Sequence, residues 1–179
     1  MFKKIVKNLE PSSTLKINEL SKELEKDGKE IFKFGFGQSP FAIPTNIVDA
    51  LKDNASHNKY LPMQGLQKLR EAIAKFITTK KKYEYKSENI IIGPGTKELM
   101  FLLQIIFDGE ILLPAPSWVS YHPQATLSRN QVHWIQTKRE NNWFPTADDI
   151  EKVVLKNKEK NYLLFLNSPN NPSGQVCSN

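Results

Sequence analysis

The 179-residue sequence contains a single cysteine, Cys177, so it has neither a disulfide framework nor a cysteine-rich zinc site. No apolar run approaches the roughly 20 residues that a membrane-spanning helix needs. The basic start is interrupted by Lys7 and Glu10, where a secretory leader would be apolar. Eight glycines and 11 prolines are too few for a collagen-like or low-complexity chain. These absences predict a cytoplasmic protein that does not enter a membrane.

Hydrophobic residues make up 39% of the chain and charged residues 25%, a balance typical of sequences that bury a core. The net charge is +6, but the basic runs Lys80–Lys82 and Lys156–Lys160 carry no interleaved aromatics and follow predicted helices. We therefore expect no nucleic-acid partner. The three histidines lie far apart with no metal-ligand spacing, so no metal site is expected.

Apolar periodicity predicts mainly helices in the first half of the chain. Helical spacing runs over Leu15–Lys26, over a segment that begins at Pro44 and includes Ile47 and Leu51, and over Leu66–Lys80. The alternating residues Ile31–Phe34 predict a short strand, followed by a loop over Gly35–Pro40.

The second half alternates strands with helices. The predicted strands are Asn89–Ile92, Glu110–Leu113, Val132–Ile135 and Tyr162–Leu166, and the predicted helices are Thr96–Phe107, Trp118–Leu127 and Asp148–Leu155. This alternation predicts the α/β class, a three-layer α/β/α arrangement with a mostly parallel sheet. The loops that follow parallel strands gather at one sheet edge, where ligands collect.

The loop Gly93–Lys97 joins a predicted strand to a predicted helix. Its glycines permit a sharp turn, and the amides of Thr96 and Lys97 would face outward at the helix start, where free N–H groups and the helix dipole favour an anion such as phosphate. The segment lacks the glycine spacing of the Walker and dinucleotide motifs. An ordinary glycine turn with Thr96 as N-cap is the alternative.

Two further loops follow predicted strands. In Leu113–Tyr121, Trp118 could stack on a flat ring or simply pack in the core. A serine nucleophile is disfavoured there, because the flanking glycines of a hydrolase elbow are missing. In Asn167–Gly174, the asparagine amides could donate to a ligand oxygen, or the segment could be a plain turn.

Taken together and in this order, the loops resemble the class I/II aminotransferases of the fold-type I pyridoxal-phosphate enzymes. The resemblance runs from about Phe34 to Gly174. Its anchors are Phe34–Phe41, Tyr60 with Gly65–Arg70, Gly95–Lys97, Pro116–Tyr121 and Asn167–Gly174.

The resemblance implies pyridoxal 5′-phosphate as cofactor and a role for each matched residue. Gly95, Thr96 and Lys97 would hold its phosphate, Trp118 would stack on its ring, Asn171 would donate to its phenolic oxygen, and Tyr60 would reach the cofactor of a partner subunit. Gly37, Trp118 and Asn171 would also contact the substrate. The family further implies cis peptide bonds at Ala115–Pro116 and Asn171–Pro172.

The implied activity is transfer of an amino group from an amino acid to a 2-oxo acid in a homodimer. Residues 1–41 would belong to a small domain, and residues 42–179 would form the first half of a large cofactor-binding domain. The family's cofactor-bearing lysine lies well beyond the asparagine-proline loop, whereas this sequence ends five residues after Gly174, so no catalytic residue is assigned.

We therefore expect an N-terminal fragment, inactive and poorly soluble by itself. A non-catalytic remnant, a subunit of a split enzyme, and a lyase of the same fold are the alternatives.

Overall fold

The computed structural model describes residues 3–9, 12–35, 37, 39–81 and 83–177. Phe36 and Gln38, part of the predicted Gly35–Pro40 loop, lie outside the described residues. The chain divides into two compact units. We call the described residues of 1–9 and 94–179 the sheet unit, and those of 10–93 the helical unit. The domain boundary after residue 41 stays a prediction.

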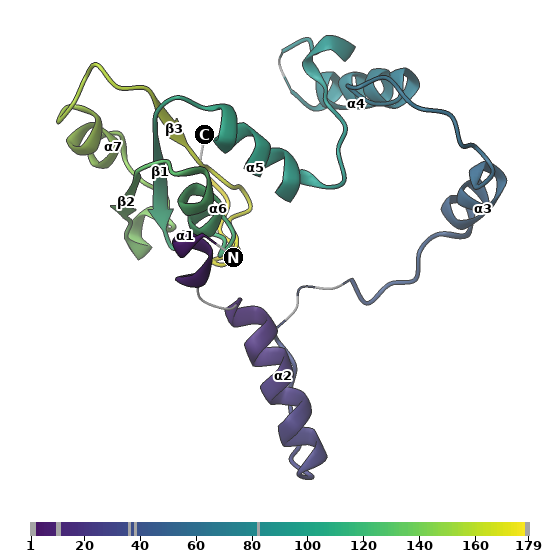
Figure 1. Ribbon diagram of the computed structural model, residues 1–179, viewed down its shortest axis with the longest axis horizontal. Coiled ribbons are helices and arrows are strands. Elements are labelled where there is room, and N and C mark those ends of the chain that lie inside the picture. Colours follow the sequence, from purple (N-terminus) through teal and green to yellow (C-terminus); the bar gives the residue numbers. More distant parts are fainter. Residues whose placement is uncertain (1–2, 10–11, 36, 38, 82, 178–179) are drawn as a thin grey trace. The chain divides into compact units, whose positions relative to one another are not determined.

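The sheet unit carries three parallel strands in the order β2-β1-β3 (Figure 1). Its elements are α1 (Lys4–Lys7), α5 (Thr96–Ile106), β1 (Glu110–Ala115), α6 (Tyr121–Ser128), β2 (Val132–Gln136), the 3-10 helix η2 (Arg139–Asn141), α7 (Ala147–Val154) and β3 (Tyr162–Leu164). In the register, Ile111 lies between Val132 of β2 and Leu163 of β3.

Side chains of consecutive strand residues point to opposite faces of the sheet, and all residues of β1 from Glu110 to Pro114 are buried. Both faces of the central strand are therefore covered. On one face, Ile111 and Leu113 pack with Tyr121 and Ala125 of α6. The predicted α/β class with a parallel sheet is confirmed. The three predicted strands and three predicted helices of this region form within a few residues of their expected bounds.

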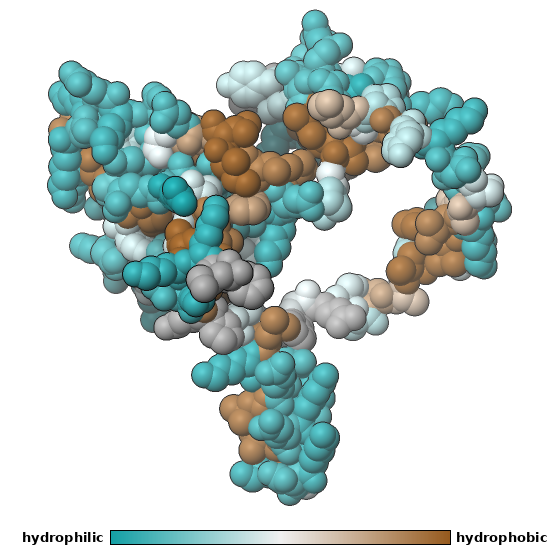
Figure 2. All heavy atoms as spheres, viewed as in Figure 1, coloured by the Kyte–Doolittle hydropathy of each residue, from teal (hydrophilic) through white to brown (hydrophobic). Residues whose placement is uncertain are grey.

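The helical unit consists of α2 (Ser13–Lys26), α3 (Thr45–Asn54), α4 (Gln67–Lys80) and the 3-10 helix η1 (Ser87–Asn89). The predicted helices are confirmed, with Pro44 as the N-cap residue of α3. Figure 2 shows apolar side chains gathered along α3, where Ile47 and Leu51 are 56% and 72% exposed. Exposed apolar faces of this kind are typical of surfaces that pack against further protein.

Two predicted strands are wrong. Ile31–Phe34 forms no strand, and Asn89–Ile92 forms the end of η1 followed by irregular backbone. The Ile92 amide donates to the carbonyl of Gln64, 3.0 Å away, in a loop. An apolar run becomes a strand only when another strand offers a ladder of hydrogen bonds, and Ile92 finds a single loop carbonyl instead.

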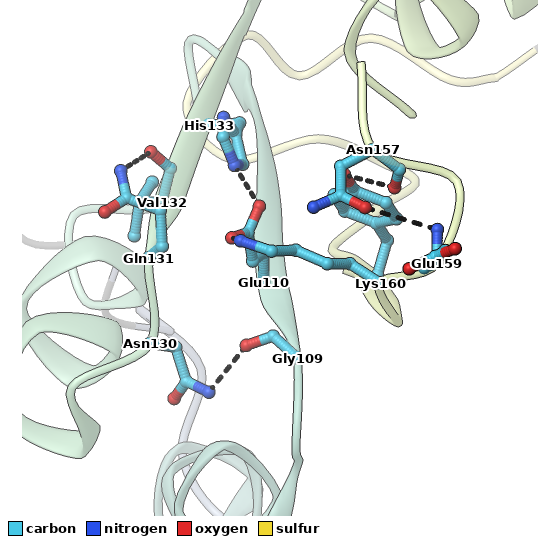
Figure 3. A network of polar contacts seen from close by, with 10 residues as sticks. Gly109, Glu110, Asn130, Gln131, Val132, His133, Asn157, Glu159 and Lys160 are labelled. Atoms are coloured by element: carbon cyan, nitrogen blue, oxygen red, sulfur yellow. Dashed lines mark hydrogen bonds and ion pairs between the residues drawn. The ribbon is translucent and has the colours of Figure 1, made fainter. Parts of the chain in front are cut away.

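An ionic cluster joins the three strands at their amino ends (Figure 3). Glu110 of β1, 9% exposed, accepts a hydrogen bond from Lys160, which precedes β3, and its Oε2 lies 2.5 Å from Nε2 of His133 in β2. Lys160, the last residue of the basic run Lys156–Lys160, pairs with Glu110 because the parallel register brings the lead-in to β3 next to the start of β1.

Glu110→Gln is expected to lower the free energy of unfolding by about 1–2 kcal/mol at neutral pH, because the carboxylate's charged hydrogen bonds are lost. Lys160 chiefly, and His133 next, hold the pKa of Glu110 below its ordinary 4.5 despite its burial. A lowered folded-state pKa contributes stability above 4.5 that is lost as the pH falls through the folded value. Urea unfolding at pH 7 and at acidic pH should therefore show a shallower acid loss for the variant. Parallel pH profiles would contradict this role for Glu110.

No helix in the described part of the chain is long and apolar enough to cross a membrane. Within the same residues, no cluster of three or more histidine, cysteine or acidic side chains could hold a metal ion.

Candidate functional site

Three segments of the sheet unit meet at the carboxyl edge of the strands. β1 ends at Ala115 and β3 ends at Leu164, so the loops 116–120 and 165–174 both begin at this edge. α5 leads into β1 through a short connection, so it runs back across the sheet and begins at the same edge. The carbonyl of Lys97 in its first turn is 2.8 Å from the side-chain nitrogen of Gln124.

The start of α5 offers backbone donors without a side-chain cap. Gly95 is the N-cap residue with φ +100°, a conformation that L side chains rarely adopt. Gly95, Thr96 and Lys97 are exposed, and no atom lies within 4 Å of where a Cβ on Gly95 would stand. The first N–H groups of a helix lack intrahelical acceptors, so these amides suit an anion. The N-cap residue is Gly95 and not Thr96, which is the first helical residue.

Trp118 lies beside this helix start. Its ring is half-buried and meets Tyr121 edge-on, with centroids 5.4 Å apart. Tyr121 in turn stacks on Phe165, the residue that follows β3, at 4.8 Å. The Nζ atom of Lys97 is 5.5 Å from the centroid of the Trp118 ring. Trp118 therefore packs on the core and also stands next to the ammonium group of Lys97, a residue of the first turn of α5.

Asn170 holds the two strand-end loops together. This buried residue donates from Nδ2 to Ser173 Oγ at 2.9 Å and to the Pro116 carbonyl at 3.4 Å. Its neighbour Asn171 is exposed, and the Asn171 backbone N–H donates to Oδ1 of Asn167 at 2.9 Å. Asn170 thus faces inward and ties the loops, which leaves the Asn171 side chain on the surface of the edge.

The peptide bonds Ala115–Pro116 and Asn171–Pro172 are cis, which confirms the prediction, and Ser168–Pro169 is a third cis bond that was not predicted. Behind these loops lies a pocket of about 10 Å³, enough for about one water molecule. Ser117, whose buried Oγ lacks a hydrogen-bond partner among the described residues, lines it together with Tyr121. Burial raises the pKa of Tyr121 above its ordinary 10.0.

The structure thus brings five of the predicted residues to one edge of the sheet unit: Gly95, Thr96, Lys97, Trp118 and Asn171. Gly37 and Tyr60 belong to the helical unit, and both are exposed. Sequence reasoning missed Asn170 and the paired glutamines 104 and 124, which are buried polar residues without a periodic pattern. Only the asparagine repeat in the loop hinted at Asn170.

The fold and this edge define an α/β protein of the parallel-sheet class whose polar loops gather at one end of the strands. The chain belongs to the family of class I and II aminotransferases, whose sequence profile matches residues 29–179. That assignment confirms the family resemblance and places the chain among relatives named as transferases.

Two curated relatives and one solved structure illustrate the similarity. An aspartate aminotransferase of Bacillus sp. (strain YM-2) is 35% identical over 176 residues, which are 96% of this chain and 44% of that protein. An asparagine–oxo-acid transaminase of Streptococcus mutans is 30% identical over 97% of this chain and 45% of that protein. The aspartate aminotransferase of Thermus thermophilus with maleate superposes with a TM-score of 0.87 at 26% identity, covering 99% of this chain and 47% of that one. The chain spans a little under half the length of these relatives.

Proposed function

We propose that this chain forms the phosphate-holding half of a pyridoxal 5′-phosphate site in an aminotransferase, which transfers an amino group from an amino acid to a 2-oxo acid. The observation that carries the proposal is the uncapped start of α5 beside Trp118, in a chain of the aminotransferase family. The cofactor would supply an electron sink for the amino acid's α-carbon.

The residues present fit a phosphate on a flat aromatic ring. The amides of Thr96 and Lys97 would donate to phosphate oxygens, and the open space at Gly95 lets a ligand approach the backbone. The Lys97 ammonium adds positive charge beside Trp118, whose half-buried ring would cover one face of the ligand ring. The exposed Asn171 amide would donate to the ring's phenolic oxygen.

Further parts of the proposal concern the helical unit and the assembly. Tyr60, fully exposed at 104%, would reach the cofactor phosphate of a partner subunit in a homodimer, and Gly37 would offer its backbone to the substrate carboxylate. Residues 1–41 would contribute to a small domain. The names of the relatives support amino acids and 2-oxo acids as substrates, aspartate among them.

Thr96→Pro is expected to weaken binding of pyridoxal 5′-phosphate about ten- to a hundredfold, because it removes one N–H donor to a charged phosphate. Proline is well tolerated at the first position of a helix, so the fold should survive. Tryptophan fluorescence during titration measures the affinity. The matched control Thr96→Ala keeps the amide and loses the hydroxyl and the γ-methyl group, so its affinity should fall much less.

Pyridoxal, which lacks the phosphate, should bind far more weakly than pyridoxal 5′-phosphate to the unmodified chain. Equal affinity for the two compounds, or equal behaviour of the proline and alanine variants, would contradict the proposed phosphate site.

A further inference from the structure

Two buried carboxamide side chains connect α6 to the first turn of α5. Gln124 of α6 donates from Nε2 to the Lys97 carbonyl at 2.8 Å. Gln104, in the middle of α5 and fully buried, donates from Nε2 to Oε1 of Gln124 and to the Met100 carbonyl, both at 3.2 Å. The three hydrogen bonds form a relay from the body of α5 through α6 back to the start of α5.

The two glutamines of the relay lower stability as packing residues between α5 and α6. Gln124 is 8% exposed and Gln104 is not exposed at all, and Oε1 of Gln104 has no hydrogen-bond partner among the described residues. A buried polar atom without a partner is destabilising, and apolar side chains of the same shape would pack at this place without that penalty. Stability alone therefore does not account for two glutamines between these helices.

The end point of the relay is the residue that carries the proposed phosphate contact. The Lys97 carbonyl and the Glu98 N–H lie in one planar peptide group, which is joined to the Lys97 N–H through a single Cα atom. Holding this carbonyl therefore limits rotation of the peptide groups in the first turn. Tyr121, which begins α6, donates its N–H to the Trp118 carbonyl at 3.1 Å. α6 is therefore bonded both to the anion-binding turn and to the segment that carries the aromatic ring.

We propose that Gln124, oriented by Gln104, is a positioning residue that holds the first turn of α5 at a fixed orientation and distance from Trp118, so that phosphate donors and ring surface fit one ligand. The inference rests on the proposed function. It assigns no chemical step to either glutamine.

The test compares Gln124→Met with the double variant Gln104→Met/Gln124→Met, which replaces the whole relay by unbranched apolar side chains of similar length. Gln131→Met, at an exposed glutamine of the same unit, is the control. For each protein we would measure the affinity for inorganic phosphate and for pyridoxal 5′-phosphate, the thermal midpoint, and the amide hydrogen exchange of residues 98–101 without ligand.

Gln124→Met should weaken binding of both ligands about three- to tenfold, the effect of losing the hydrogen bond to the Lys97 carbonyl. It should also speed amide exchange at residues 98–101. The double variant should recover the thermal midpoint of the unmodified chain, because the apolar side chains restore packing. Its affinity for both ligands should stay low, because the Lys97 carbonyl still lacks its side-chain donor. The control should match the unmodified chain.

Wild-type affinity and exchange in Gln124→Met would overturn the positioning role, and so would affinity that recovers together with stability in the double variant. Failure of the proposed function has a different signature, namely no measurable phosphate binding by the unmodified chain. In that case, unchanged amide exchange in Gln124→Met would overturn the claim that Gln124 fixes the first turn of α5. Faster exchange confined to residues 98–101 would support that claim.

Discussion

Gly109→Ala is expected to lower the free energy of unfolding of the sheet unit by about 3 kcal/mol, the upper range for forcing an extra methyl group into packed structure. A Cβ on Gly109 would stand 2.4 Å from the carbonyl oxygen of Asn161 and 2.6 Å from Cε1 of Phe107. The Phe107 ring can turn, but the Asn161 carbonyl is fixed because it accepts the Glu110 N–H at 2.9 Å. Relief of the clash therefore separates β3 from the start of β1.

Urea unfolding followed by circular dichroism measures this loss. Gly37→Ala is the matched control, since nothing lies within 4 Å of the added Cβ and the backbone is not in the left-handed region. Its stability should stay within about 0.5 kcal/mol of the unmodified chain. Equal stability of the two variants would mean that the close approach of β1 and the Asn161 backbone does not exist in solution.

Gly65→Ala should destabilise the helical unit by a similar amount, about 3 kcal/mol, for two separate reasons. Gly65 has φ +96°, and its Cβ would stand 2.5 Å from Cβ of Ile92. The position also anchors α4, because Nε of the buried Arg70 donates to the Gly65 carbonyl at 3.3 Å while its Nη1 donates to the Ser87 carbonyl at 2.9 Å. Loss of hydrogen-exchange protection along α4 measures the effect.

Gly28→Ala separates the two causes. Gly28 has φ +77° and no atom within 4 Å of its added Cβ, so the substitution carries the backbone strain without the clash. Gly28→Ala should lower the free energy of unfolding by only about 1 kcal/mol. If Gly65→Ala and Gly28→Ala lower the free energy of unfolding equally, the Ile92 side chain does not contact Gly65. The loop at Gly65 would then not pack against residues 90–92 as described.

Local patterns sufficed for most of the fold. The apolar runs that became β1, β2 and β3 were recognisable because each lies between turn residues and helices with clear periodicity. The same reasoning was wrong for Asn89–Ile92, where the Ile92 amide instead bonds to the carbonyl of Gln64, far away in the sequence. Local pattern contains no information about which carbonyl an amide will meet.

The residues of the candidate site likewise fall into two groups, those that the sequence identified and those that only the structure shows. Gly95 was identifiable because a left-handed backbone at a helix start favours glycine, and Trp118 because it follows a strand in a proline-rich loop. Asn170 and the pair Gln104 and Gln124 act through contacts across 20 to 54 residues of chain, which only the folded structure displays. The predicted residues of the sheet unit thus lie at its carboxyl edge, whereas the sequence did not reveal the buried side chains that hold this edge together.

The central claim is that the first turn of α5 and the neighbouring Trp118 receive the phosphate and ring of one ligand. Titration of the isotope-labelled chain with pyridoxal 5′-phosphate, followed by amide and indole resonances in NMR spectra, tests it most directly. The account predicts the largest shifts at the amides of residues 95–98 and at the indole N–H of Trp118, with inorganic phosphate moving the amides alone. Shifts centred on the lysine-rich segment 156–160, with residues 95–98 unchanged, would contradict it.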